Sequence, residues 1–477
     1  MHDVDPSINL NNNANANAND NTSINNIYNS ATQAIKTQYD IKIIKEQQLN
    51  LIHERDDYPL SYIFFKCLYE TELLNRILSH PPDITDLHTF MDWHRENIEY
   101  IDFDLIHTIM NELYHNNNNN NDNDNDVYEE LKLVYALMFK PTGIRKILHD
   151  AIYDNKFISV DVQYDLESVD LQYTEYLIDE RHRVHLFVPK DKSIPDLTKI
   201  AVTINTMESL AKIYTDRSDI PPVDLKIIFS DQKKTVYPWT RILCCDNINS
   251  GSTYPGVSIV CWRREEFQKV LIHELFHYYK FDFYKTDPFY NQLSNMILIP
   301  KINESESDTD MLNECYTEAC TIIILILIRY VMLNLNNNST DDLYRYLISH
   351  LKIEITFIMF QVAKMISIFG GDSFNDYVTG KTIIKQRTSF RSYFMVKLLL
   401  LYNIYELLDF INDSMVVSNE RLLQLGNLIN SSWIKFLKDD HNIRIIDNFI
   451  SQNKEAFNTD DNRWIFRTCR MCVNDSV

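Results

Sequence analysis

The chain has 477 residues, of which 45% are hydrophobic, and it carries a formal net charge of -21. This length and apolar content are sufficient for a large core, while the acidic balance and the lack of a Lys/Arg cluster argue against a nucleic-acid partner. Only 7 residues are glycine. Few positions therefore adopt positive φ cheaply, which favours helices over a turn-rich β architecture.

Localisation is expected to be cytoplasmic or otherwise intracellular. The first 20 residues lack the basic start and apolar segment of a secretory signal, and the 8 cysteines are irregularly spaced. The longest apolar run, IIILILI at 322–328, is too short to span a bilayer, so we expect no membrane partner. The Asn-rich composition favours an A+T-rich source such as a large DNA virus or a protist, and a viral protein could also reside in the virion.

The N-terminal third is expected to contain no catalytic chemistry. Residues 1–33 are rich in Asn, Ala, Asp and Ser without an apolar period, which predicts a disordered tail. Apolar residues at helical spacing then predict a helical N-terminal domain over 34–155. The Asn/Asp-rich tract at 116–126 is interpreted as an insertion in a surface loop of that domain.

Residues 156–477 are expected to form the catalytic region, with a β-rich part at 156–265 and a helical part at 266–477. Short β-branched or aromatic runs bounded by turn residues predict strands at 183–189, 199–204, 224–230 and 256–262. Helical patterns follow at 264–285, 309–334, 341–369, 388–412, 419–437 and 442–456. The predicted fold class is therefore α+β, predominantly helical, with a small sheet ahead of the first of these helices.

The stretch VLIHELFHYYKFDF at 270–283 contains a candidate metal site. His273 and His277 are four residues apart and share one face of a helix, so both can point at one ion. Glu274 lies beside that ion, where a base must sit to take a proton from an activated water. The alternative is a buried helix with two ordinary histidines.

A second stretch, LNECYTEAC at 312–320, supplies candidates for the third ligand. Glu314 and Glu318 lie four residues apart at the start of a long apolar helix, where two carboxylates are costly unless paired or bound to metal. A zinc ion would satisfy one of them, and the other can accept the second ring N–H of a ligating histidine. Glu304 and Glu306, in the acidic loop before this helix, are rival ligands.

The pair VLIHELFH and NECYTE resembles the gluzincin metallopeptidases, the thermolysin-like class of zincins, over roughly residues 180–410. The resemblance implies a zincin-like fold, one Zn²⁺ ion and a sheet whose edge strand binds extended substrate. It implies His273, His277 and Glu314 as zinc ligands and Glu274 as general base. Asn313 then corresponds to the asparagine that precedes the third ligand, and Glu318 takes the place of the acid that supports a histidine.

Other residues could complete such a site. Tyr393 is the first candidate for a donor that stabilises an oxyanion and Arg391 the second, with Tyr377 and His350 as weaker ones. Asp282 is interpreted as a helix-end acid or a support for a ligand. The glycines of SGSTYPGV at 250–257 indicate either a close backbone approach or an ordinary turn. CRMC at 469–472 is half a zinc knuckle, a redox pair or two incidental cysteines.

The sequence therefore predicts a zinc-dependent peptidase with a peptide or protein substrate. Two alternatives stay open: a catalytically inactive zincin-fold protein with a structural or interaction role, and a zinc hydrolase that acts on non-peptide amides.

Overall fold

The computed structural model describes residues 22–49 and 143–475, except for 153–154, 156, 168–170, 216–218, 284–289, 301–311, 334–339, 460, 462 and 474. The chain divides into two compact units, one formed by residues 1–49 with 155–477 and the other by 50–154. In the second unit, the helix α7 (Gly143–Ile152) is described. All further elements belong to the first unit.

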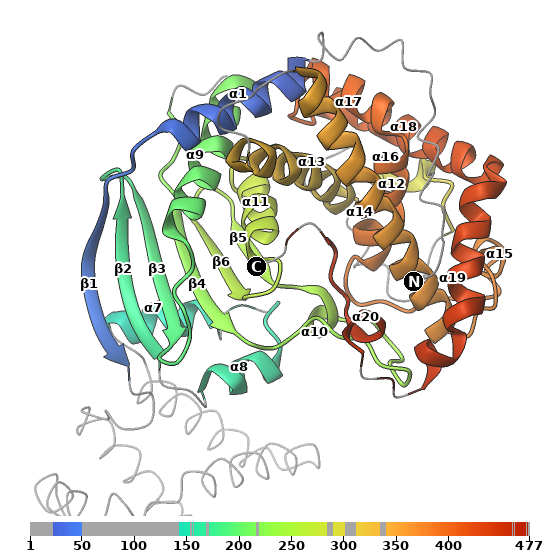
Figure 1. Cartoon of the computed structure of the whole chain (residues 1–477), viewed down its shortest axis with the longest axis horizontal. Coiled ribbons are helices and arrows are strands. Elements are labelled where there is room, and N and C mark those ends of the chain that lie inside the picture. Colours follow the sequence, from blue (N-terminus) through green and yellow to red (C-terminus); the bar gives the residue numbers. More distant parts are fainter. Residues whose placement is uncertain are drawn as a thin grey trace, which may run out of the picture. The chain divides into compact units, whose positions relative to one another are not determined.

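A six-stranded mixed sheet forms one side of this unit, in the order β1-β2-β3-β4-β6-β5 (Figure 1). The strands are β1 (Ile41–Leu49), β2 (Leu171–Ile178), β3 (His182–Pro189), β4 (Asp224–Ser230), β5 (Gly251–Tyr254) and β6 (Ser258–Arg263). β3, β4 and β6 run parallel, whereas β1, β2 and β5 join by antiparallel pairing. The short strand β5 lies at one edge, next to β6.

Helices α9 (Leu197–Tyr214) and α11 (Phe267–Tyr278) share one apolar core with the sheet. α9 connects the parallel strands β3 and β4, as a parallel pair requires. α11 follows β6 directly and contacts both β5 and β6. α1 (Thr22–Lys36) packs on α9, and α8 (Val160–Glu167) contacts β4.

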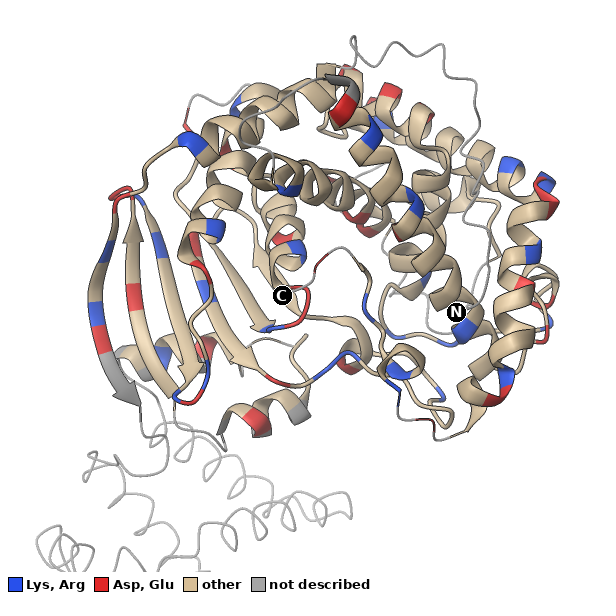
Figure 2. Cartoon of the chain, in the orientation of Figure 1, with Lys and Arg blue, Asp and Glu red and all other residues tan. Residues whose placement is uncertain are grey.

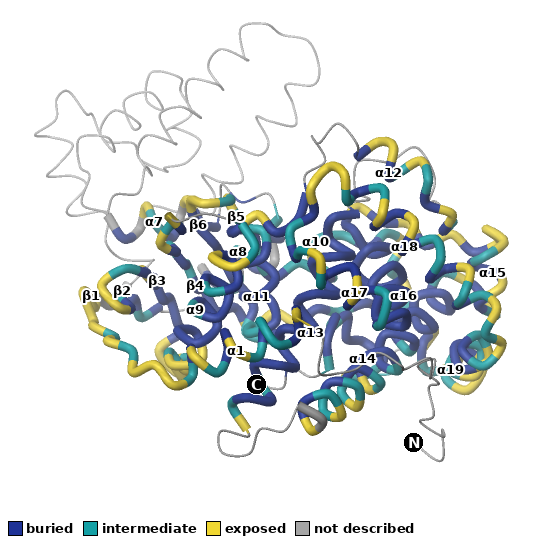
Figure 3. Tube along the Cα trace, turned by 90° about the horizontal axis from the view of Figure 1, so that it is seen from above, coloured by how far each residue is buried: buried dark blue, intermediate teal, exposed yellow. Residues whose placement is uncertain are grey.

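The other side of the unit is helical, and α13 (Asn313–Leu333) lies at its centre. α13 contacts α1, α11, α14 (Thr340–Ile368), the π-helix η4 (Arg391–Val396) and α16 (Lys397–Tyr402). Figure 3 shows α11 and α13 in the buried interior. The remaining helices are α10 (Cys245–Ile248), α12 (Tyr290–Met296), α15 (Phe374–Val378), α17 (Ile404–Asp413), α18 (Asn419–Lys438), α19 (Asp440–Asn458) and α20 (Trp464–Arg467).

α13 is long and apolar enough to cross a membrane, but 83% of that apolar stretch is buried inside the protein. In Figure 2 its ribbon is free of charged residues over most of its length. Its charged residues are Glu314 and Glu318 in the first two turns and Arg329 near the end. Such burial is typical of the core helix of a globular unit, as the sequence predicts for this run.

The fold is mixed α/β and mostly helical with one sheet, which agrees with the predicted α+β class. The strands predicted at 183–189, 224–230 and 256–262 correspond to β3, β4 and β6. The helices predicted at 309–334, 341–369, 419–437 and 442–456 correspond to α13, α14, α18 and α19. The helix predicted at 388–412 is instead divided into η4, α16 and α17, with the last break at Asn403.

Two expectations for the N-terminal region are wrong where the structure describes it. Residues 22–33 of the predicted disordered tail form most of α1, because Ile24, Ile27 and Ala31 recur at helical spacing and are buried. Residues 41–49, expected in a helical domain, form β1 and pair with β2. The rest of the tail and most of the predicted helical domain, with its 116–126 insertion, lie outside the described residues.

The strand predicted at 199–204 is also wrong, because these residues lie inside α9. The Asp196 side chain accepts from the backbone N–H groups of Thr198 and Lys199 and so caps the helix start. Every residue from Ile200 to Ala211 except Asn205 and Ser209 is buried. The sequence of a helix that is buried on most sides has few polar interruptions and can be rich in β-branched residues. Periodicity alone does not distinguish such a run from a strand.

The helix predicted at 264–285 ends earlier, at Tyr278, because the chain turns there. Lys280 has φ 61, its N–H donates to His277 O, and the N–H of Phe281 donates to Phe276 O. The rings of Phe276 and Phe281 lie 4.9 Å apart between centroids. These bonds and this contact form a Schellman motif, with lysine where glycine is usual.

Replacement of Lys280 by glycine is expected to stabilise the protein. A left-handed conformation costs a residue with a Cβ about 1 kcal/mol, so Lys280→Gly should raise the free energy of unfolding by up to about 1 kcal/mol. Urea denaturation measures this change. Lys280→Ala is the control, because alanine keeps the strain and loses only the charge; an equal gain for alanine would contradict the explanation.

Candidate metal centre

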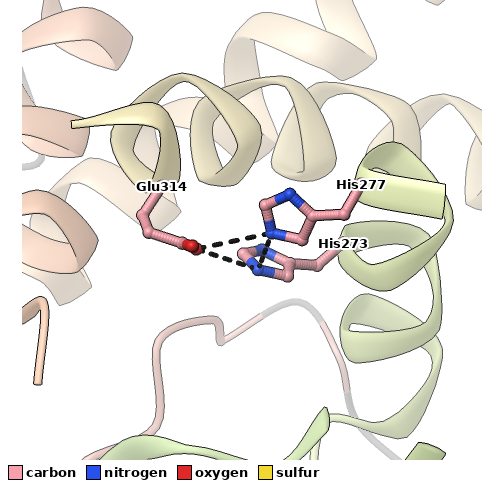
Figure 4. Close-up of side chains that lie close together, drawn as sticks. All are labelled: His273, His277 and Glu314. Carbon is pink, nitrogen blue, oxygen red and sulfur yellow. Dashed lines mark hydrogen bonds and ion pairs between the residues drawn. The ribbon is translucent and has the colours of Figure 1, made fainter. Parts of the chain in front are cut away.

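Two helices bring three potential ligands together. α11 contributes His273 and His277 one turn apart, and the first turn of α13 contributes Glu314 (Figure 4). The Nε2 atoms of the two histidines are 3.0 Å apart. Glu314 Oε2 lies 3.1 Å from His273 Nε2 and 3.5 Å from His277 Nε2. One ligand atom from each residue thus lies within 4.8 Å of the others, and the group could hold a metal ion.

These separations suit a small tetrahedral ion. Bonds of about 2.0–2.1 Å at tetrahedral angles place ligand atoms roughly 3.4 Å apart, close to the three distances observed. The side chains of His273, His277 and Glu314 are 9%, 13% and 9% exposed, so the centre is nearly but not completely closed. A site with three protein ligands and limited access from outside has room for one more, smaller ligand.

The opposite ring nitrogens of both histidines face carboxylates. His273 Nδ1 lies 2.8 Å from Glu318 Oε1, and His277 Nδ1 lies 2.8 Å from Asp282 Oδ2. A carboxylate favours the tautomer whose proton is on Nδ1, which leaves the Nε2 lone pair directed at the other ligands.

The third ligand atom needs a cation. Glu314 Oε2 is buried against the Nε2 atoms of both histidines, which donate no hydrogen bond to it while their protons are on Nδ1. Burial raises the pKa of Glu314, but the charges of His277 and His273 outweigh it and lower the pKa well below its usual value. Burial likewise lowers the pKa of His277, yet Asp282 and Glu314 outweigh it and raise the pKa well above 6.5. The carboxylates therefore attract positive charge to this point, as protons or as a metal ion.

Asp282 owes its position to the end of α11. The turn at Lys280 reverses the chain so that Asp282 lies against His277. Asn313, the first residue of α13, donates from Nδ2 to Asp282 Oδ2 at 3.1 Å, and Glu314 Oε1 is 3.5 Å from the same nitrogen. Asn313 thus links the support of one histidine to the third ligand.

Glu318 is held between two buried lysines. Its Oε1 pairs with Lys269 Nζ, and its Oε2 accepts from Lys397 Nζ at 3.2 Å. Both lysines are at most 1% exposed. Burial raises the pKa of Glu318, but Lys269 and Lys397 outweigh it and hold the pKa well below its usual range. Glu318 therefore stays ionised beside His273. No sequence pattern indicated these two lysines as part of the site.

Glu274 lies beside the three ligands but does not join them. Its Oε2 accepts from the Thr253 hydroxyl at 2.7 Å, and the side chain is buried. Burial is the main cause that raises the pKa of Glu274. A carboxylate with a raised pKa is a better proton acceptor than an exposed one at neutral pH.

Strand β5 approaches Glu274 closely. A Cβ on Gly251 would lie 2.5 Å from Glu274 Oε1 and 2.8 Å from Val270 Cγ1. Of the two interpretations of the 250–257 stretch, the close backbone approach is therefore correct for Gly251. Thr253 was missed as a site residue, although it lies in the same stretch.

Tyr393 lies near the ligands, whereas the position of Arg391 relative to them stays a prediction. The rings of Tyr393 and His273 are 6.3 Å apart between centroids. Burial raises the pKa of Tyr393 well above 10, and Glu314, Glu318 and Glu274 raise it further. The phenol therefore keeps its proton at neutral pH and can donate a hydrogen bond. Arg391 is buried in the same π-helix, with its backbone N–H donating to the Gln386 side chain.

The remaining candidates have other surroundings. His350 Nδ1 bonds to the carbonyl of Tyr346 in its own helix, and Tyr377 packs against Phe374. Cys469 and Cys472 are buried free thiols. Glu304 and Glu306 lie outside the described residues.

Comparisons with models of protein families, with curated proteins and with solved structures found no match.

Third-ligand identity is testable by substitution. We expect Glu314→Gln to weaken Zn²⁺ binding at least tenfold, because the amide carries no charge. Competition with a chromophoric chelator measures the dissociation constant. Glu306→Gln is the matched control and should bind as tightly as the wild type. The reverse result would make Glu306 the ligand.

Substitution of Gly251 should displace Glu274. Gly251→Ala is expected to lower the free energy of unfolding by about 1–3 kcal/mol, because the added methyl group overlaps the Glu274 side chain. In a Glu274→Ala background the loss should shrink, since one of the two overlaps disappears. Urea denaturation of the four proteins of this cycle measures the coupling, and equal losses in both backgrounds would show that Glu274 is not the obstacle.

Proposed function

We propose that the protein is a zinc-dependent peptidase of the gluzincin type, with a zincin-like catalytic region. The observation that carries the proposal is the convergence of His273 Nε2, His277 Nε2 and Glu314 Oε2 beside the buried carboxylate of Glu274. Two imidazoles, one carboxylate and an open position form the ligand set of catalytic zinc sites. The HExxH motif lies on helix α11 and the NExxTE motif on helix α13, which agrees with the two motif helices that the resemblance to gluzincins implies.

Charge balance supports a divalent ion. Four carboxylates lie at the centre, from Glu274, Asp282, Glu314 and Glu318, and two ammonium groups compensate them, from Lys269 and Lys397. With both histidines neutral, as metal ligation requires, two negative charges remain in a largely desolvated place, where uncompensated charge is costly. One dication balances them.

Each residue has a definite task in the proposed reaction. Bound zinc would supply a Lewis acid that polarises a carbonyl and acidifies water. Glu274 accepts the proton of the attacking water and passes it to the leaving amine. Tyr393, which keeps its proton, donates a hydrogen bond to the oxyanion. Thr253 orients Glu274 from β5.

The edge of the sheet offers a place for an extended peptide. β5 pairs with β6 on one side and, within the described residues, with no strand on the other. Because β5 also contacts α11, a peptide that added to this edge would run past Glu274.

The presence of Glu274 bears differently on the two alternatives, a structural zinc protein and a hydrolase of non-peptide amides. A structural zinc site needs no base, yet here a carboxylate is buried beside the ligands and Gly251 makes room for it. A hydrolase of non-peptide amides would need the same base, so only substrates separate that function from a peptidase.

Glu274→Gln is the decisive variant. We expect it to bind one zinc ion per chain, because glutamine fits the same space and Glu274 is not a ligand. Hydrolysis should fall by about 10²–10⁴-fold with the loss of the base. Elemental analysis and digestion of a peptide library test the two parts.

Three outcomes would overturn the proposal or redirect it. A wild-type protein without affinity for zinc refutes the metal centre. Cleavage by Glu274→Gln at the wild-type rate refutes the mechanism. Zinc binding by the wild type without cleavage of any peptide favours a non-peptide amide substrate or a structural role.

A further inference from the structure

The described residues that follow α20 are mostly buried and run from α20 to the start of α11 (Figure 1). We call residues 468–473 with Asp475 the strap. Cys469, Met471, Cys472 and Asp475 are each at most 5% exposed. An irregular segment at such depth must have its backbone polar groups satisfied by the elements around it.

Side chains on one face of α14 supply hydrogen-bond partners for the strap backbone. Glu354, Gln361 and Lys364 are each 0% exposed. On the buried, mostly apolar side of the helix such residues are costly unless they are hydrogen-bonded. All three bond to the strap or to the residues just before it.

The three contacts run in antiparallel order. Glu354 accepts from Val473 N at 3.0 Å, Gln361 Nε2 donates to Arg470 O at 3.1 Å, and Lys364 Nζ donates to Thr468 O. The strap therefore lies along α14 in one defined register. The two buried charged residues of α14, Glu354 and Lys364, are explained by the strap and not by the metal centre.

Two contacts connect the strap to the support of His273. Met471 O accepts from Lys397 Nζ at 2.7 Å, and Lys397 bonds Glu318. Asp475 Oδ2 accepts from the backbone N–H of Lys269 at 2.8 Å, in the first turn of α11. The Lys269 side chain holds the other oxygen of Glu318.

Asp475 also fixes α11 itself. The side chain of Glu266, at the N-cap, makes no capping bond to this helix. Instead, the carboxylate of Asp475 accepts a hydrogen bond from the Lys269 N–H in the first turn, and its charge complements the positive end of the helix dipole. His273 follows Lys269 by one turn, so a shift of that turn moves the ligand. Arg329, a residue of α13, also pairs with Asp475, and its Nη2 lies 3.1 Å from Asp475 Oδ1.

We propose that the strap is a positioning element of the metal centre, with Asp475 and the Met471 carbonyl as its acting groups. The inference rests on the proposed metal-binding function. The strap holds Lys269 and Lys397, these lysines hold Glu318, and Glu318 orients the His273 ring. Removal of an outer partner of a ligating histidine typically weakens metal binding about 10–100-fold.

The experiment compares zinc affinity with the stability of the metal-free protein. Asp475→Ala and Lys397→Met are expected to raise the zinc dissociation constant about 10–100-fold. Asp475→Asn should weaken binding less than Asp475→Ala, because its amide oxygen can still accept from the Lys269 N–H although the ion pair with Arg329 is lost. Chelator competition gives the affinity, and thermal melting of the apoprotein gives the stability.

Glu208→Gln is the control for a general loss of stability. Glu208 is a buried carboxylate on α9 that pairs with Arg181, His182 and Lys212. Its substitution should lower the melting temperature and leave zinc affinity unchanged.

Outcomes separate the two proposals. A wild type that binds no zinc refutes the metal centre. A wild type that binds zinc, with Asp475→Ala equally tight and only less heat-stable, refutes the positioning role. If Asp475→Ala does not fold, Arg329→Met, at a partly exposed position, loosens the same aspartate with less disturbance. It should raise the dissociation constant at least threefold, and an unchanged value then refutes the proposal.

Discussion

Desolvated carboxylates at the contact of α11 and α13 are the constraint around which this unit is built. Glu314 and Glu318 begin a helix whose next ten residues are all buried, so water compensates neither charge. Their partners come from four different elements: the histidines and Lys269 of α11, Lys397 at the start of α16, Tyr393 of η4 and Asn313 of α13 itself. The packing of α11, η4 and α16 against α13 brings these partners to the carboxylates.

The two carboxylates of α13 differ in what compensates them. Glu318 is balanced by two lysines and remains charged whether or not an ion is bound. Glu314 faces two imidazole nitrogens, which compensate it only when they are protonated or share an ion with it. In the proposed metal centre, this difference suits Glu318 to a permanent supporting role and Glu314 to a ligand role. It also explains why two glutamates four residues apart on one face need not act alike.

Sequence reasoning was accurate where the chemistry is local. HExxH spacing and the i, i+4 pair of glutamates place five residues of the centre, because helix geometry alone fixes which of them share a face. The helices predicted at 309–334, 341–369, 419–437 and 442–456 follow from the same periodicity, whereas the one predicted at 388–412 is divided in the structure. Sequence patterns failed for the elements whose secondary structure is decided by tertiary contacts. β1, β2 and β5 depend on pairing partners, and α9 resembles a strand because it is buried on most sides.

The lysines around Glu318 show a different limit of sequence patterns. Lys269 lies in the first turn of α11, where a charged residue is usually solvated, and Lys397 begins a helix more than a hundred residues later. No spacing rule connects them. Only the close packing of α11, α13 and α16 turns three separate charges into one cluster.

The same packing gives a physical reason why the strap and the metal centre belong together. A buried ion pair is weak support on its own, because desolvation cancels much of the attraction between its charges, and it holds its geometry only when the remaining donors and acceptors are satisfied. Lys397 has Met471 O for that purpose, and Asp475 fixes the backbone from which the Lys269 side chain extends. Without the strap, Lys397 would lose one of its acceptors in a place that water does not reach, and the first turn of α11 would lose its cap. Either change allows Glu318 to relax toward a different partner, and His273 would lose the carboxylate that fixes its ring. The orientation of the His273 ring therefore depends on how firmly the Met471 carbonyl and the Asp475 carboxylate are held at the outer end of this series of contacts.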